Sequence, residues 1–348
     1  MSLEDKIKKN LIRWISDDAP QNDIVLSSRI RLARNLDNYL YPNMSDEKTK
    51  EEVSDRIKEA ISASDITLNY IKIADIPKSE KELLVEKHLI SPAHAVPGIE
   101  KGVFINDGET ISIMVNEEDH LRIQILKPGM QLSKAWEDAD EIDNILEKKL
   151  DIAFSEQWGY LSSCPTNVGT GLRASVMVHL PALKITNNIN KMLAAVSQLG
   201  LAIRGLYGEG SESIGNIYQI SNQITLGHSE NDIIENLISV THQIINQERN
   251  ARQALLVEQE VIVKDKIKRS YGILKYAHRI SNEEALELLS YLKLGIDMGI
   301  IEDVYDRVLI ELMVIIRPAH IEKIYGKELN KVEEDIMRAK LIQTKLTI

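Results

Sequence analysis

The pattern of apolar and polar positions divides the chain into a mixed region of strands and helices and a final helical region. Apolar and β-branched runs predict strands over 23–36, 66–73, 103–105, 111–115, 201–206 and 216–221. Helical spacing of apolar positions predicts helices over 1–16, 45–63, 79–89, 131–157, 187–199 and 229–256. The turn Asn106-Asp107-Gly108 predicts a hairpin between two of the strands.

Beyond residue 256 the sequence has no glycine-rich loop and favours helices. Ser281 with Glu284, and Asn330 with Glu333, form capping boxes that predict helices over 285–294 and 331–346. An apolar stripe in this region is either a core or a dimer face; it contains Leu309, Leu312, Ile315 and Ile316. We therefore expect two domains, over 1–256 and 257–348, the second all helical.

Composition narrows the class of protein. The 348 residues include 53 acidic and 42 basic side chains, for a net charge of −11. This balance argues against a general nucleic-acid-binding surface and leaves a local basic cleft open. Cys164 is the only cysteine, so no internal disulfide forms, which fits a reducing cytoplasm. The N-terminus has no apolar signal core and no segment is long and apolar enough to span a membrane, so we expect a soluble cytoplasmic protein.

The segment 162–175, SSCPTNVGTGLRAS, combines several unusual residues and little periodicity. Gly169 and Gly171 suit positive φ and a close approach of another group to the backbone. Arg173 offers a forked, permanently charged donor for carboxylate or phosphate. Cys164 precedes Pro165, where the backbone is held extended. Taken alone, the segment fits an ordinary turn equally well.

Arginines and carboxylates gather in other segments as well. Arg29 and Arg31 lie on one face of the first strand, which suits phosphate oxygens or a solvated edge. Three consecutive carboxylates, 117–119, are either solvated or held by a cationic ligand. The P-loop, dinucleotide-binding and common metal motifs are absent. With Arg122, Arg173, Glu118 and Glu212, the inventory is the one that phosphoryl transfer needs.

The motifs SSRIRLAR, NEEDHLR, CPTNVGTGLRASV and YGEGSE, in this order, resemble the catalytic domain of the phosphagen (guanidino) kinases. The chain is most similar to the bacterial protein arginine kinases of that superfamily. The resemblance covers about 20–256, and the tail is of the same kind. It implies an α+β fold: an antiparallel sheet flanked by helices, followed by a small all-α domain. It also implies that ATP lies across the sheet and phosphorylates a guanidinium nitrogen, with Mg²⁺ held by the nucleotide rather than by dedicated protein ligands.

The resemblance also implies residue roles. Glu118 and Glu212 correspond to the catalytic carboxylates, and Cys164 to a reactive cysteine near the guanidinium. The positions matching nucleotide-contacting residues are Ser27, Ser28, Arg29, Ile30, Arg31, His88, Arg122, Arg173, Ala174, Ser175, Val176, Met177, Arg204, Gly205, Leu206, Tyr207, Gly208 and Glu209. Moving a proton from arginine (pKa above about 12) to an ordinary glutamate (pKa about 4) costs about 11 kcal/mol. Glu118 is therefore expected to orient the guanidinium and take its proton late, as the P–N bond forms.

The sequence departs from the family pattern in three places. Tyr207 stands where the small-guanidine kinases have an arginine, so Arg204 is expected to replace that phosphate contact. The N-terminal helical domain of those kinases is missing, which predicts an open pocket suited to an arginine on a protein. In the tail, the phosphoarginine-binding signature RDxxRA reads EDIMRA: Asp335 and Arg338 persist, but Glu334 replaces the first arginine. We expect phosphoarginine binding there to be weak or absent.

The favoured function is therefore an ATP-dependent protein arginine kinase, dimeric through its tail. The resemblance implies substrates with exposed arginine, an activator protein, a stress-response repressor and Clp-type proteolysis. It implies no nucleic acid and no membrane as partners. Two alternatives remain: a kinase for free arginine or another small guanidine, and a non-catalytic adaptor that binds arginine or phosphoarginine.

Overall fold

An eight-stranded antiparallel sheet forms the centre of the protein. The computed structural model describes residues 15, 19–96, 98, 100–205, 214–304 and 306–347, without the side chains of 306 and 307. The strand order is β2-β3-β4-β5-β1-β8-β10-β9. These strands are β1 Val25–Arg34, β2 Asn69–Lys72, β3 Gly102–Ile105, β4 Ile111–Val115, β5 Leu121–Pro128, β8 Leu172–His179, β9 Leu201–Gly205 and β10 Ile217–Asn222. A separate hairpin pairs β6 Phe154–Ser155 with β7 Gly159–Tyr160.

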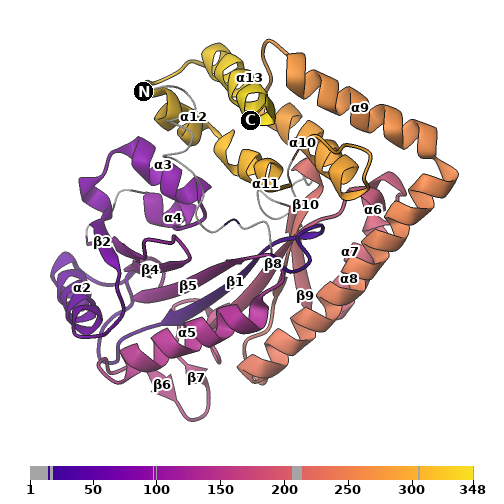
Figure 1. Cartoon of the computed structure of the whole chain (residues 1–348). Helices are drawn as coiled ribbons and strands as arrows, with labels where there is room; N and C mark the ends of the chain where they lie inside the picture. The colour runs from indigo at the N-terminus through magenta and orange to yellow at the C-terminus, as the bar shows by residue number, and fades with distance from the viewer. Residues whose placement is uncertain are drawn as a thin grey trace.

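Helices surround this sheet. In the first part of the chain they are α2 Glu47–Ser62, α3 Lys78–Glu86, α4 Pro92–Ala95, α5 Leu132–Glu147, α6 Pro181–Ile185, α7 Ile189–Gln198 and α8 Glu230–Glu258, with short 3-10 turns η1 Ile73–Asp75, η2 Pro165–Asn167 and η3 Ile214–Asn216. The tail contains α9 Glu260–Tyr276, α10 Asn282–Asp297, α11 Asp306–Ile315, α12 Pro318–Tyr325 and α13 Lys331–Thr347. Figure 1 shows α5 below the sheet and the tail helices α11 to α13 above it. No helix in the described ranges is both long and apolar enough to cross a membrane.

The two faces of the central sheet differ because side chains alternate along each strand. Ile30 of β1, Ile125 of β5 and Val176 of β8 are almost completely buried on one face, against which α5 packs. Arg31 of β1 pairs with Arg173 of β8, so these two side chains share the opposite face. The alternation that builds the core therefore also directs the arginines away from it.

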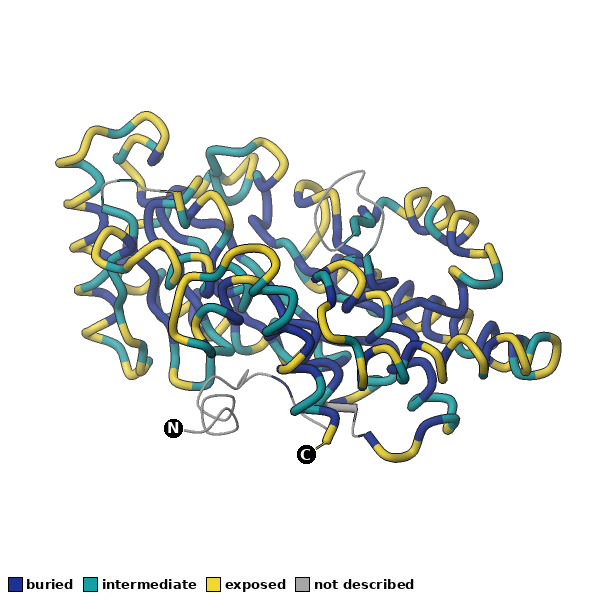
Figure 2. Tube along the Cα trace, turned by 90° about the horizontal axis from the view of Figure 1, so that it is seen from above, coloured by how far each residue is buried: buried dark blue, intermediate teal, exposed yellow. Residues whose placement is uncertain are grey.

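The tail shares its hydrophobic core with the sheet domain, and Figure 2 shows buried positions running through both. Its apolar stripe is buried, which makes it core rather than a dimer face; the stripe contains Leu309, Leu312, Ile315 and Ile316. The expected fold class, an antiparallel sheet flanked by helices with a helical tail, is confirmed. The domain division at 256/257 stays a prediction; α8 runs to Glu258 and α9 begins at Glu260.

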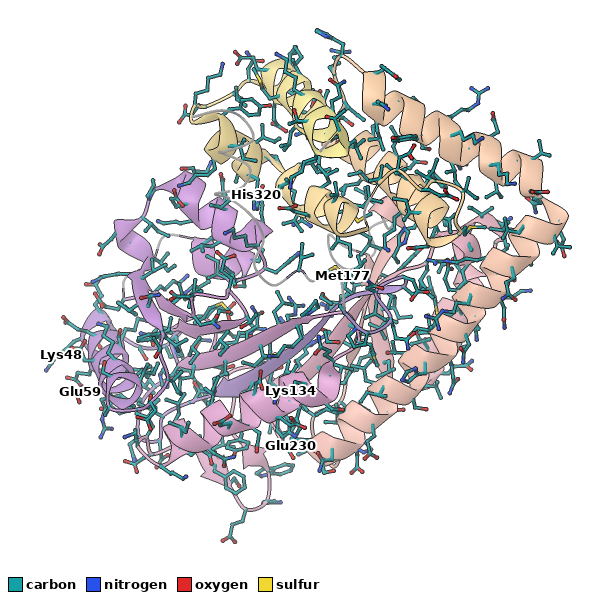
Figure 3. All side chains as sticks on the ribbon, in the orientation of Figure 1. Lys48, Glu59, Lys134, Met177, Glu230 and His320 are labelled. Atoms are coloured by element: carbon teal, nitrogen blue, oxygen red, sulfur yellow. The ribbon has the colours of Figure 1, made fainter. Side chains whose placement is uncertain are left out.

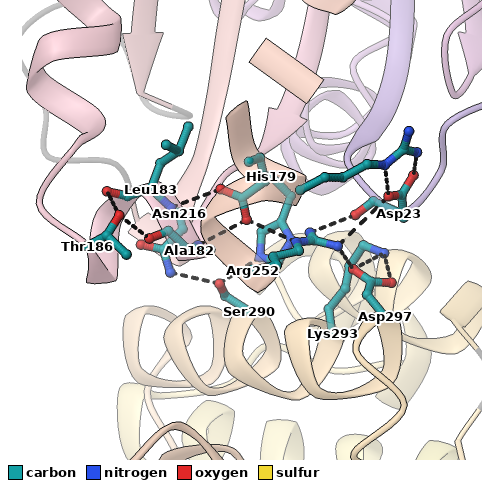
Figure 4. Close-up of polar contacts among 12 residues, drawn as sticks. Asp23, His179, Ala182, Leu183, Thr186, Asn216, Arg252, Ser290, Lys293 and Asp297 are labelled. Carbon is teal, nitrogen blue, oxygen red and sulfur yellow. Dashed lines mark hydrogen bonds and ion pairs between the residues drawn. The ribbon is translucent and has the colours of Figure 1, made fainter. Parts of the chain in front are cut away.

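A buried polar network attaches the tail to the sheet (Figure 4). Arg252 of α8 forms ion pairs with Glu248 at 3.0 Å and Asp297 at 3.1 Å. The hydroxyl of Ser290 on α10 lies 2.7 Å from His179 Nε2 and accepts a hydrogen bond from Asn216 at 2.8 Å. Because Asn216 ends η3 and precedes β10, helix α10 holds the chain where it enters that strand.

The structure confirms most predicted elements and corrects three. The hairpin around 106–108 is present, as are the caps, where Ser281 Oγ accepts from the Glu284 amide at 3.1 Å. The predicted helix over 131–157 is too long, since α5 ends at Glu147 and the β6–β7 hairpin follows. The segment 162–175 is not all loop, because β8 starts at Leu172. Helix α3 ends at Glu86, which leaves His88 in a turn with φ of +61°. The predicted helix over 1–16 lies almost entirely outside the described residues.

Candidate active site

Arginines from three adjacent strands form a cluster on the face of the sheet opposite α5. Arg29 and Arg31 come from β1, Arg122 from β5 and Arg173 from β8. Burial, together with the charges of Arg122 and Arg173, lowers the pKa of Arg29 to about 10. Burial, followed by the charges of Arg29, Arg122 and Arg173, lowers the pKa of Arg31 as well, although Glu117 opposes the shift. Guanidinium groups stay charged in proteins. Binding of an anion would therefore relieve the repulsion among these arginines.

Arg31 also has an unused donor. Its Nε is buried and has no hydrogen-bond partner among the described residues. A buried polar group without a partner costs free energy unless a ligand or water satisfies it. Oxygens of a polyphosphate would satisfy both this donor and the surplus charge. The residues present therefore fit the phosphates of a nucleoside triphosphate.

A cleft of about 530 Å³ lies over this face, and Arg29, Arg31 and Arg122 line it. A smaller hollow beside it is lined by Ser27, His88, Ser175, Met177 and Gln219, among others; Met177 is labelled in Figure 3. Arg29 Nη2 donates to Gln219 Oε1 at 2.7 Å. Burial and the charges of Arg317 and Arg29 lower the pKa of His88, so its imidazole is neutral at pH 7.

The alternation along β1 and β8 separates the predicted nucleotide residues into two groups. Ser27, Arg29, Ser175 and Met177 line the cleft or hollow. The side chains of Ile30, Ala174 and Val176 are buried in the hydrophobic core. Ser28 is also buried; its hydroxyl donates to the Gly129 carbonyl at 2.8 Å and accepts from the Gln131 amide at 2.9 Å. These four side chains do not reach the cleft, so a nucleotide could contact these positions only through their backbone.

The other predicted nucleotide residues lie at the β9 edge or beyond the described ranges. Arg204 of β9 pairs with Gln219 of β10 and so shares the cleft face. Gly205 ends β9. Leu206, Tyr207, Gly208 and Glu209, together with the second catalytic carboxylate Glu212, lie outside the described residues. Within the described ranges, no group of three or more His, Cys, Asp or Glu residues could hold a metal ion.

The three consecutive carboxylates 117–119 have three different environments, which neither sequence interpretation anticipated. Glu117 forms an ion pair with Arg122 at 2.6 Å and accepts from Ser91 Oγ at 2.5 Å. Burial alone would raise the pKa of Glu117, but Arg122 and Ser91 outweigh it and lower the value. Glu118 is exposed and Asp119 is buried. Only Glu118 therefore presents its carboxylate to solvent.

Asp119 connects the carboxylate turn to the Cys164 loop. Its Oδ1 accepts from Asn35 Nδ2 at 2.7 Å and from the Ser163 amide at 2.7 Å. The Ser162 hydroxyl donates to the same carboxylate at 3.1 Å. Ser163 Oγ in turn donates to the Glu118 carbonyl at 2.8 Å. Asp119 thus fixes the relative position of the segments that carry Glu118 and Cys164.

Glu118 and Cys164 lie together at this junction. Partial burial, followed by the charge of Asp119, raises the pKa of Glu118, while Arg122 and a side-chain hydrogen bond with Cys164 oppose the rise. Cys164 is half-buried, and its Sγ also lies 3.0 Å from Thr166 Oγ1. A carboxylate with a raised pKa is a better proton acceptor near neutral pH. The pair therefore combines a proton acceptor with a polar sulfur beside the arginine cluster.

Sequence reasoning missed several residues that shape this site. Asp119 and Glu117 were visible only as parts of a charged run, and their partners come from distant segments. Gln219 lies in a strand without any motif. Arg317 and Asn282 of the tail also line the cleft. The tail therefore forms part of the cleft wall, which the sequence motifs did not indicate.

The EDIMRA segment of the tail is occupied by internal contacts. Arg338 is fully buried and donates to the carbonyls of Ile316 at 2.8 Å and Ile280 at 3.0 Å. It also pairs with Asp335 at 2.7 Å and with Glu334. Glu334 therefore takes part in neutralising the guanidinium that a phosphate would need.

Comparisons with known proteins agree with the arrangement. Residues 48–251 match the family model of the ATP:guanido phosphotransferase C-terminal catalytic domain, and residues 259–348 match that of the protein-arginine kinase McsB C-terminal domain. A protein-arginine kinase from Halothermothrix orenii is 64% identical over 349 residues, covering 100% of both chains. The chain belongs to the protein-arginine kinase family.

Other members of this family and solved structures extend the comparison. A protein-arginine kinase from Bacillus subtilis is 46% identical, over 99% of this chain and 96% of its own. The structure of a lombricine kinase matches with a TM-score of 0.59 and 26% identity, over 72% of this chain and 71% of that one. A duplicated taurocyamine kinase from Schistosoma mansoni matches with a TM-score of 0.61 and 26% identity, over 68% of this chain and 34% of that one. As a member of the family, this protein is an enzyme with the phosphagen-kinase fold.

Proposed function

We propose that this protein-arginine kinase transfers the γ-phosphoryl group of ATP to the guanidinium of arginine residues in proteins. The observation that carries the proposal is the juxtaposition of a guanidinium cluster with an exposed glutamate of raised pKa, Glu118. The cluster would bind the phosphates, and Glu118 would face the acceptor. Relatives named protein-arginine kinase support the choice of acceptor.

Each side of the site has a separate task in this proposal. Arg29, Arg31, Arg122 and Arg173 hold the phosphates and neutralise charge that develops during transfer. Mg²⁺ bound to the nucleotide would supply further charge neutralisation. Glu118, with Glu212 as its partner carboxylate, clamps the planar guanidinium in line with the phosphoryl group. Cys164 adds a polar or negative contact and need not form a covalent bond.

The transfer breaks the bond between the γ-phosphorus and the bridging oxygen, and ADP leaves with that electron pair. A guanidinium nitrogen forms the new P–N bond and loses one proton, which Glu118 accepts. The raised pKa of Glu118 reduces the cost of this step relative to an ordinary glutamate. Proton transfer late in the reaction avoids the roughly 11 kcal/mol of full deprotonation beforehand.

The test is to incubate the full chain with ATP, Mg²⁺ and an unfolded protein such as casein, followed by mass spectrometry that preserves P–N bonds. Phosphoarginine on casein is expected, and Glu118→Gln should abolish it without unfolding the protein. Glu59→Gln, at an exposed site on α2 (Figure 3), is the matched control and should remain active. Labelling of casein by the Glu118→Gln variant would contradict the catalytic assignment.

The same assay separates the alternatives. A small-molecule guanidino kinase would phosphorylate free arginine faster than casein. A non-catalytic adaptor would bind arginine or phosphoarginine without turnover. The tail, which matches the C-terminal domain of a protein-arginine kinase, favours the protein substrate.

We extend the proposal to the setting of the enzyme. It would act in the cytoplasm with an activator protein and a stress repressor, and would mark proteins for Clp-type degradation. It would form a homodimer through the tail region. The exposed apolar side chains Val257, Val261 and Ile262, where α8 meets α9, are suited to contact with a second copy.

A further inference from the structure

The helical tail supplies part of the wall of the nucleotide cleft. Asn282, at the start of α10, and Arg317, directly before α12, line it together with Arg29, Arg31 and Arg122. Arg317 is 286 positions from Arg31 in the sequence, by subtraction of their numbers. The cleft therefore contains a cation from a part of the chain that does not belong to the sheet.

The carboxylate of Glu86, the last residue of α3, holds helix α12 against α3. Glu86 accepts from the amides of Ala319 at 2.9 Å and His320 at 3.0 Å, and its Oε2 lies 2.6 Å from His320 Nδ1. Figure 3 labels His320 at this junction. Because a carboxylate is favourable at a helix N-terminus, Glu86 holds the first turn of α12 beside the cleft. Arg317 immediately precedes that turn.

A second contact fixes the same segment from inside the tail. Arg338 donates to the carbonyl of Ile316 at 2.8 Å and to that of Ile280 at 3.0 Å. Ile316 directly precedes Arg317, and Ile280 lies two residues before Asn282. One buried guanidinium therefore positions both tail segments that reach the cleft.

The charge of Arg317 lowers the pKa of a residue inside the site. Arg317 is the largest electrostatic cause of the lowered pKa of His88, ahead of Arg29. His88 lines the cleft with both arginines. Arg317 from the tail and Arg29 from the sheet therefore both act on His88.

We propose that Arg317 is a nucleotide-binding residue which the tail contributes to the cleft, where its guanidinium contacts a phosphate oxygen of ATP. Arg338 is a positioning residue for it. The inference rests on the proposed nucleotide site and adds the tail to it. The tail would then be required for nucleotide affinity, not only for contact with other proteins.

The test measures the binding of Mg-ADP and of adenosine to the full chain by calorimetry. Arg317→Met removes the cation and keeps an apolar stem, so the affinity for Mg-ADP should fall about tenfold or more, as expected for loss of a charged hydrogen bond. Adenosine carries no phosphate, so its affinity should not change. Arg317→Lys should recover part of the affinity for Mg-ADP.

The control is Lys323→Met, which removes a cation from the same junction, where Lys323 pairs with Glu80 and does not line the cleft. This variant should bind Mg-ADP like the wild type.

Equal Mg-ADP affinity in Arg317→Met and the wild type would overturn the inference. An equal loss of Mg-ADP and adenosine binding would overturn it too, because Arg317 would then only shape the wall. If Arg317→Met does not fold, the same comparison applies to Arg317→Lys and Arg317→Gln. Failure of the wild type to bind Mg-ADP would instead refute the proposed function.

Discussion

Replacing Asp119 with asparagine should loosen the junction between the Glu118 turn and the Cys164 loop while leaving its shape intact. The carboxylate accepts two hydrogen bonds of 2.7 Å, from Asn35 and from the Ser163 amide. Hydrogen bonds to a charged group contribute about 1.5–3 kcal/mol and neutral ones about 1 kcal/mol. Neutralising the acceptor should therefore reduce the free energy of unfolding by about 2 kcal/mol.

The same substitution should reduce activity through geometry. Ser163 also holds the Glu118 carbonyl, so a weaker junction allows Glu118 and Cys164 to shift relative to each other. Small displacements of positioned groups cost up to about 100-fold in rate, so kcat/KM for protein arginine should fall about 10- to 100-fold. The KM for ATP should change little, because Asp119 does not line the cleft.

The pH dependence gives a third, independent readout. In the proposed mechanism Glu118 must be ionised, so activity is lost as pH falls through its pKa. Asp119 raises that pKa, and the acid limb of the wild type should therefore lie above the usual range for glutamate. In Asp119→Asn the pKa of Glu118 falls and the acid limb moves to lower pH.

The measurements are urea unfolding, initial rates of casein labelling, and kcat/KM between pH 4 and pH 8. Asp140→Asn, at an exposed site on α5, is the control and should match the wild type in all three. Wild-type stability together with an unmoved acid limb in Asp119→Asn would refute the reasoning.

Two further predictions concern buried arginines. Arg34 pairs with Asp143 at 2.5 Å, and both side chains are buried, so Arg34→Met should lower the free energy of unfolding by about 3–5 kcal/mol in urea titrations. The exposed Arg56→Met should have little effect, and equal stability of the two variants would contradict the prediction. Calorimetry with free phosphoarginine should detect no micromolar binding to the tail, because Arg338 is buried and paired with Glu334. Micromolar binding by the wild-type tail would show that these internal contacts open.

The sequence by itself determined the fold class and much of the candidate site. Alternation along 25–34 already placed Arg29 and Arg31 on one face, because the period of a strand is a local property. Helix caps such as Ser281 were also readable, since a cap depends on residues three apart. The order of four short motifs was enough to indicate the family.

Only the tertiary structure decided the burial, the partners and the position in the site of residues that are distant in the sequence. The start of strand β8, residues 172–175, shows little strand periodicity in the sequence; its partner strands β1 and β10 come from distant segments. Glu117, Glu118 and Asp119 look alike in the sequence. In the structure Glu117 forms an ion pair with Arg122, Glu118 is exposed to solvent, and Asp119 is buried and accepts hydrogen bonds at the junction with the Cys164 loop. The position of Arg317 in the cleft depends on the docking of α12 against α3. Desolvation and electrostatic interactions depend on which groups are close in space, so their effect on a residue is known only from the folded chain.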